Sequence, residues 1–184
     1  MAAKMETERL FLRRWRERDR AAFAAINADP DVMRYFRSTL NQDESDTFMA
    51  RVETHFDTHG FGFWAVEEKQ SGQLVGLTGL ARVTFDAPFA PAVEIGWRFA
   101  SNVWGRGYAP EAARAALHAG FGQFALDEIV AFTIPANTPS RRVMEKLGMT
   151  YNASDDFEHP SLPTGHALRP HVLYRVQAAA FKTV

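Results

Sequence analysis

The sequence predicts an α+β domain in which helices flank one mixed central β-sheet. Helical spacing dominates the first 60 residues, period-two segments fill the middle, and strands alternate with helices after residue 93. Of 184 residues, 46% are apolar, and neither a repeat nor a linker interrupts the chain. We therefore expect residues 1–184 to form a single domain.

The first part of the chain predicts one strand followed by helices. Residues 9–15 (RLFLRRW) alternate apolar and basic side chains, which is typical of a strand with one solvated face. Residues 19–36 show helical spacing with a break at Pro30. Residues 41–59 predict a second helix, which an Asn caps at its start and Gly60 ends.

The middle of the chain changes to extended segments. Residues 61–67 and 73–83 predict a hairpin, and a third strand over residues 93–99 follows a loop rich in proline and alanine. The remaining elements, in order, are a helix over 110–124, a strand over 128–134, a helix over 139–147 and a strand over 171–176.

Charge and cysteine content exclude several classes of protein. The 21 basic and 22 acidic residues leave a formal charge of -1, so no global field favours nucleic acid or an anionic membrane. The sequence has no cysteine, which excludes disulfides, thiolate metal sites and a cysteine nucleophile. Residues 1–9 lack the apolar core of a signal peptide, and we expect a cytoplasmic protein.

The most informative segment is the run Asn102–Ala109 (NVWGRGYA), which joins a strand to a helix. Two glycines separated by one residue let several N–H groups converge beside a positive helix end, an arrangement that binds phosphate or pyrophosphate, although the same pattern also occurs in simple turns. A P-loop would need Lys-Ser or Lys-Thr after the glycines. A dinucleotide fingerprint would need Gly or Ala where this sequence has Pro110. It would also need an acidic residue at the end of the next strand, whereas Asp127 precedes that strand. The loop therefore fits neither pattern.

Three motifs together resemble the GNAT (GCN5-related) N-acetyltransferases, and among these the branch that acetylates N-termini of ribosomal proteins. They are Glu94–Trp97 (EIGW), Trp104–Ala109 (WGRGYA) and Asn137–Met149 (NTPSRRVMEKLGM). The element order agrees over nearly the whole chain. One departure is Asn102, where the family often has Gln or Arg; the loop grips mainly through its backbone.

The resemblance implies acetyl-CoA as the cosubstrate, with its pyrophosphate in the glycine loop and its pantetheine arm along the strand over residues 93–99. An extended strand can hold the two amides of that arm as a sheet edge holds a peptide. The side chain of Trp97 could instead pack in the core, and Asn137 could cap the helix that follows it. The expected cosubstrate-binding residues are Trp97, Arg98, Phe99, Trp104, Gly105, Arg106, Gly107, Tyr108, Ala109 and Asn137.

Acyl transfer from a thioester to an amine needs a base for the amine and a proton source for the thiolate. Ser140 shares a helical stripe with Met144 and Leu147, so we expect its hydroxyl to face the core side. It either satisfies backbone groups at the helix start or, as the resemblance implies, protonates the CoA sulfur. Met144 stands where many members have a catalytic tyrosine, which excludes that mechanism.

Glu94 is the acidic residue expected inside the sheet, because its strand is otherwise apolar. It either takes the amine proton, through water, or pairs with Arg98 or another cation. Some relatives place the base on the following strand, at the position of Phe132, which cannot act as one.

The acceptor is predicted to bind after the short helix over residues 139–147, because carboxylates and histidines are concentrated in residues 155–171. These carboxylates either attract a cationic amine or belong to a solvated loop. His55 and His59 have zinc-like spacing, but no Glu follows the first His, and the pair suits a helix C-terminus better than a metal.

The sequence thus predicts an acetyl-CoA-dependent N-acetyltransferase in which the amine of a small molecule or peptide attacks the thioester directly. The resemblance favours a peptide α-amine. The alternatives are a non-catalytic acyl-CoA binding or sensing module, in which Glu94 is tied up in an ion pair, and a Rossmann-type nucleotide binder. We expect neither nucleic acid nor a membrane as a partner, and the sequence leaves the oligomeric state open.

Overall fold

The computed structural model describes residues 4–181, which build one nine-stranded sheet. Its strand order is β1-β2-β3-β4-β5-β6-β9-β7, and β8 pairs with β9. Neighbouring strands are antiparallel except β5 and β6, which are parallel, so the predicted mixed sheet is confirmed. The strands are β1 (Met5–Glu6), β2 (Leu10–Arg13), β3 (Phe63–Glu68), β4 (Leu74–Arg82), β5 (Val93–Phe99), β6 (Glu128–Thr133), β7 (Thr150–Tyr151), β8 (Phe157–Glu158) and β9 (Pro170–Gln177).

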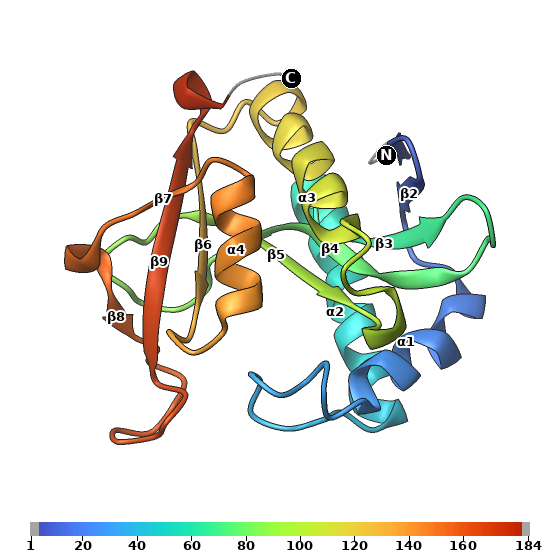
Figure 1. Ribbon diagram of the computed structural model, residues 1–184, viewed down its shortest axis with the longest axis horizontal. Helices are drawn as coiled ribbons and strands as arrows, with labels where there is room; N and C mark the ends of the chain where they lie inside the picture. The colour runs from blue at the N-terminus through green and yellow to red at the C-terminus, as the bar shows by residue number, and fades with distance from the viewer. Residues whose placement is uncertain (1–3, 182–184) are drawn as a thin grey trace.

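Helices cover both faces of this sheet. In Figure 1, α3 (yellow) and α4 (orange) lie in front of the strands and α2 (cyan) lies behind them. Leu117 on α3 and Trp64 on β3 are almost completely buried, so apolar side chains fill the space between the layers. The helices are α1 (Arg20–Ala28), α2 (Gln42–His59), α3 (Tyr108–His118) and α4 (Thr138–Lys146).

The ends of α2 confirm the predicted caps. Asn41 Oδ1 accepts from the Glu44 N–H at 2.9 Å, and the Glu44 carboxylate accepts from the Asn41 N–H at 2.8 Å. This reciprocal pair satisfies two N–H groups that lack partners inside the helix. At the other end Gly60 adopts a left-handed φ of 80°, which lets the chain leave the helix.

Two helical predictions differ from the structure. Residues 31–35 form turns, because the Asp29 carbonyl accepts from the Met33 N–H and the Asp29 carboxylate accepts from the Asp31 N–H. Val32 and Met33 are nevertheless buried, so their spacing reflects core contact and not a helix. The helix expected over 110–124 begins two residues earlier at Tyr108, and its last turn, Ala119–Gln123, is π-helical.

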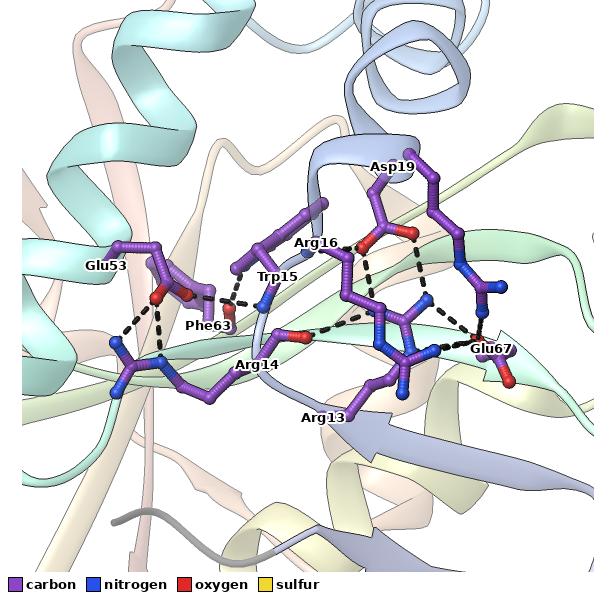
Figure 2. A network of polar contacts seen from close by, with 9 residues as sticks. Arg13, Arg14, Trp15, Arg16, Asp19, Glu53, Phe63 and Glu67 are labelled. Atoms are coloured by element: carbon purple, nitrogen blue, oxygen red, sulfur yellow. Dashed lines mark hydrogen bonds and ion pairs between the residues drawn. The ribbon is translucent and has the colours of Figure 1, made fainter.

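The basic residues of β2 are not all solvated, which corrects the expectation for this strand. Arg13 is only 4% exposed and forms ion pairs of 2.7 Å with both Asp19 and Glu67 (Figure 2). Arg18 also reaches Glu67 at 2.9 Å. The run of arginines therefore ties β2, the following turn and β3 together from within.

Candidate active site

The sheet opens where β5 and β6 meet. β5 pairs with β4 along its whole length, from Arg82↔Val93 to Gly76↔Phe99. With β6 it pairs at one position, Glu94↔Val130, and the two strands then diverge (Figure 1). From Ile95 onward the edge of β5 that faces β6 therefore has no strand partner among residues 4–181. Such an edge offers backbone N–H and C=O groups to an extended ligand.

A cleft of about 860 Å³ occupies this opening. Its size lies within the range of small-molecule and cofactor sites. It is bounded by β5, the glycine loop, the end of β6 and the start of α4, and further by the segments around residues 31–37 and 159–171. Eleven of the twelve predicted site residues line it, namely Glu94, Trp97, Arg98, Phe99, Trp104, Gly105, Gly107, Tyr108, Ala109, Asn137 and Ser140.

The glycine loop has the backbone geometry that its two glycines predict. Gly105 has a φ of 77° and Gly107 a φ of 81°, both in the left-handed region that side chains other than glycine rarely adopt. Gly107 stands directly before α3, whose first intrahelical bond runs from the Glu111 N–H to the Gly107 carbonyl at 3.3 Å.

The backbone N–H groups at the α3 end of this loop have no protein acceptor in the described part of the chain. Among residues 4–181, no acceptor is found for any backbone N–H from Gly105 to Ala109. Pro110, the next residue, has no N–H at all. Five consecutive donors at the positive end of α3 are thus available to an anion.

Side chains of the loop brace it from outside. The Arg106 carbonyl accepts from Arg9 Nη1 at 2.8 Å, and Arg9 in turn pairs with Glu111 at 2.6 Å. The Tyr108 hydroxyl donates to Glu68, whose carboxylate lies 3.6 Å from the Arg106 guanidinium. Arg106 is the one predicted site residue outside the cleft lining. The contacts made by Arg9 and Glu68 therefore hold the loop in place.

Trp104 connects the loop to the end of β5. Its indole N–H donates to the Phe99 carbonyl at 2.9 Å, while 52% of the residue stays exposed beside the cleft. This bond fixes where the glycine loop departs from the strand.

Glu94 is half-buried at the apex of the opening. Burial raises the pKa of its carboxyl group to about 7. Within residues 4–181 no side chain donates a hydrogen bond to it or forms an ion pair with it. The alternative in which Glu94 pairs with Arg98 is not realised, because the Arg98 guanidinium bonds Asn27 instead. A carboxyl group with a near-neutral pKa is suited to proton transfer.

The start of α4 brings Asn137 and Ser140 to the cleft. Asn137 Oδ1 accepts from the Ser140 N–H at 3.3 Å, and Asn137 Nδ2 donates to Thr133 Oγ1 at 2.9 Å. Met144 and Leu147 are buried as predicted. Ser140 is half-buried and lines the cleft.

The end of the cleft at which the sequence suggested acceptor-binding carboxylates is aromatic. The carboxylates of residues 155–158 are held by other groups: Asp155 by Arg175, Asp156 by the Tyr151 hydroxyl, and Glu158 by Arg169. Instead, an aromatic cluster closes this end, formed by Phe85, Phe89, Phe132, Phe157, His159 and His171.

Burial lowers the pKa of both His159 and His171, which line the cleft together with Phe132. At neutral pH these two imidazoles are therefore mostly uncharged. Period and motif do not reveal the cluster, because its members come from four separate segments. The clustering of phenylalanines in residues 85–89 is the one local signal.

His55 has a structural role. One ring nitrogen, Nδ1, bonds the Phe61 carbonyl at 2.7 Å, and the other, Nε2, accepts from the Arg82 N–H at 3.1 Å. With both nitrogens engaged, the ring cannot ligate a metal. Across residues 4–181 no group of three potential metal-ligating His, Cys, Asp or Glu side chains is found. In the same range no helix combines the length and apolarity that crossing a bilayer requires.

Known proteins share this sequence pattern. The Acetyltransferase (GNAT) domain profile matches residues 9–150. The uncharacterized protein YkkB of Bacillus subtilis is 34% identical over 150 residues, which cover 81% of this chain and 86% of YkkB. The uncharacterized N-acetyltransferase YnaD of the same species is 32% identical over 144 residues, which cover 78% of this chain and 80% of YnaD.

Solved structures share the fold. An acetyltransferase (GNAT family) from Bacillus anthracis is similar with a TM-score of 0.78 and 28% identity, covering 96% of this chain and 99% of that one. RimJ of Mycobacterium smegmatis, in complex with CoA-disulfide, has a TM-score of 0.76 and 23% identity, covering 96% and 87%. The chain therefore belongs to the GNAT acetyltransferase family and is an acyltransferase.

Proposed function

We propose that this protein transfers an acetyl group from acetyl-CoA directly to the amine of a small molecule or peptide. The observation that carries the proposal is the continuity of three features in one cleft. These are an unpaired strand edge after Glu94, five free N–H groups from Gly105 to Ala109, and the half-buried carboxyl group of Glu94 itself. The resemblance of the three motifs to the branch that acetylates N-termini of ribosomal proteins favours a peptide α-amine as acceptor.

The residues present fit acetyl-CoA. The donors of Gly105–Ala109 match a diphosphate, which carries several acceptor oxygens and is favoured by the positive end of α3. The edge of β5 at Trp97–Phe99 offers its backbone to the amides of a pantetheine arm. When bound, acetyl-CoA supplies an acetyl group activated as a thioester.

Glu94 serves as the base in this proposal. Its pKa of about 7 leaves it deprotonated in a large fraction of molecules at neutral pH, yet basic enough to accept a proton from an attacking amine. Because nothing in residues 4–181 pairs with the carboxylate, it is free to act directly or through a water molecule. The position of Phe132 on the neighbouring strand cannot provide this function.

Ser140 supplies the proton for the departing sulfur. Its hydroxyl lines the cleft, and no partner for it is found among the described side chains. Asn137 fixes Ser140 by accepting its N–H and is itself held by Thr133. Met144, which is buried, stands where many members of the family have a tyrosine for this role.

A non-catalytic acyl-CoA binding module is the second candidate. It predicts a Glu94 neutralised by an ion pair, whereas Glu94 has no such partner within residues 4–181. The free carboxyl group therefore favours transfer over mere binding.

Calorimetric titration with acetyl-CoA, CoA and NAD tests the cofactor. Acetyl-CoA and CoA should bind, and at about 100 times the dissociation constant each should stabilise the fold by about 2.7 kcal/mol. Mass spectrometry of a panel of peptides, polyamines and amino acids then tests transfer. Binding of NAD alone, or no binding of acetyl-CoA, would contradict the proposal.

A further inference from the structure

Arg98 on β5 is a half-buried cation, and within residues 4–181 it has no acidic partner. Its one side-chain hydrogen bond runs from Nη1 to Asn27 Oδ1 at 2.5 Å, and Asn27 itself is fully buried. Arg98 Nε is buried with no partner. Within residues 4–181 no carboxylate forms an ion pair with this guanidinium, and none bonds Nη2.

The surroundings of Arg98 are apolar and aromatic. The guanidinium carbon lies 4.4 Å from the centre of the Phe36 ring and 5.3 Å from that of Phe48. Burial lowers the pKa of Arg98 to about 10, which still leaves it charged at neutral pH. Stacking on aromatic rings offsets part of the desolvation, but rings do not replace a counter-ion.

Arg13 shows how the same chain treats a buried arginine that only stabilises the fold. It is held by two carboxylates, Asp19 and Glu67, each at 2.7 Å. Arg98 has none, although desolvating an unpaired charge is costly. The difference indicates that the counter-charge of Arg98 is supplied from outside the protein.

The position of Arg98 tells which ligand would supply it. Arg98 lines the cleft, as does Glu94, and the two lie on one face of β5 because they are an even number of residues apart. Four residues of strand span about 13 Å. A ligand with its amine near Glu94 can therefore place a second group at Arg98 only if several bonds separate the two.

We propose that Arg98 binds a carboxylate of the acceptor, so that the substrates are compounds carrying a reactive amine and, several bonds away, a carboxylate. ω-Amino acids and short peptides with a free C-terminus belong to this class. A planar carboxylate matches the guanidinium in shape and charge. This inference rests on the proposed acetyl transfer, and Arg98 acts in it as a specificity residue.

The experiment compares kcat/KM for ω-amino acids of increasing length and for dipeptides, each against its own C-terminal amide. The wild-type enzyme should prefer the acid over the amide by about tenfold or more at the best length, the effect of one charge-assisted hydrogen bond. In Arg98→Met this preference should disappear, so that each acid and its own amide react with the same kcat/KM. Arg82→Met, which removes an exposed arginine outside the cleft lining, should keep the preference.

Equal rates for acids and amides in the wild type, or a preference that survives in Arg98→Met, would overturn the role of Arg98 and leave acetyl transfer intact. Failure of acetyl-CoA to bind would instead overturn the proposed function itself. If Arg98→Met does not fold, inhibition of the wild type decides. Pentanoate should compete with the acceptor and pentanamide should not, and equal inhibition by both would overturn the inference.

Discussion

Glu94 and Val130 are Cα partners at the one register position that joins the parallel strands β5 and β6 within residues 4–181. On one side of this pair the sheet is closed, and on the other it opens into the cleft. The carboxyl group of Glu94 therefore stands where the backbone edge of β5 first becomes free. This placement gives the acid both the burial that raises its pKa and access to whatever enters the opening.

Glu94→Gln should lower kcat by about 100-fold or more, the usual contribution of a positioned general base. The amide keeps the shape of the side chain, so acetyl-CoA affinity should stay within about threefold of wild type. Glu17→Gln, at an exposed acid paired only with Arg20, is the matched control and should retain full activity. Unchanged kcat in Glu94→Gln would remove Glu94 from the mechanism.

The pH dependence follows from the same group. Below pH 7 Glu94 is protonated and cannot accept a proton, so the ratio of wild-type to Glu94→Gln activity should rise with pH and level off above about 7. Taking the ratio with one acceptor cancels the titration of the amine.

The stability of the fold should change with pH in the opposite direction. Folding raises the pKa of Glu94, so the folded state holds this proton more tightly than the unfolded state does. The resulting contribution to the free energy of unfolding is fully present below pH 4.5 and is lost as the pH rises through 7. Glu94→Gln should thus gain about 1–3 kcal/mol over wild type in urea unfolding at pH 8, relative to pH 5.

Ser140→Ala should lower kcat by about 10- to 100-fold, less than the change at Glu94, because a thiolate is a tolerable leaving group even without protonation. Ser154→Ala is the control, since Ser154 is exposed and lies outside the cleft lining. Rapid-quench kinetics with a fixed acceptor measures the difference. Equal kcat in the two variants would mean that Ser140 has only a structural role.

Gly105→Ala and Gly72→Ala form a matched pair. Both glycines have a left-handed φ, 77° and 67°, and an added methyl group would meet nothing within 4 Å at either site. Each substitution should therefore cost about 1 kcal/mol of stability through backbone strain. Only Gly105→Ala should weaken acetyl-CoA binding, by about tenfold, because it disturbs the free N–H groups. Equal affinities by calorimetry would place the diphosphate elsewhere.

Arg13→Ala should destabilise the fold by about 3–5 kcal/mol in urea unfolding, since it leaves the buried carboxylate of Asp19 without its ion-pair partner. Arg34→Ala breaks an ion pair with Asp31 in which both side chains are about 60% exposed, and it should cost less than about 1 kcal/mol. Comparable losses in the two variants would contradict a structural role for the buried network.

Local signals in the sequence predicted much of the fold and the conformation of the glycine loop. Asn41 and Gly60 mark the ends of α2 through bonds to near neighbours, and Gly105 and Gly107 set the loop through their own φ angles. Such features depend on a few consecutive residues. They can therefore be deduced without knowing the rest of the fold.

Features that depend on distant partners were missed. Arg13 reads as solvated from its alternation with apolar residues, but its burial is decided by Asp19 and Glu67. The aromatic end of the cleft joins Phe85 to His159, which lie 74 positions apart, and the divergence of β5 from β6 leaves no trace in either strand. Tertiary packing decides these points, so they could not be deduced from local sequence.

The role of the N–H groups of Gly105 to Ala109 is tested most directly by the response of backbone amides to ligand in ¹⁵N-labelled protein. CoA should shift the NMR signals of Gly105 to Ala109, whereas pantetheine, which lacks the diphosphate, should shift those of β5 and leave the loop amides in place. Loop amides that do not respond to CoA, or that respond equally to pantetheine, would contradict the claim that these five N–H groups hold the diphosphate.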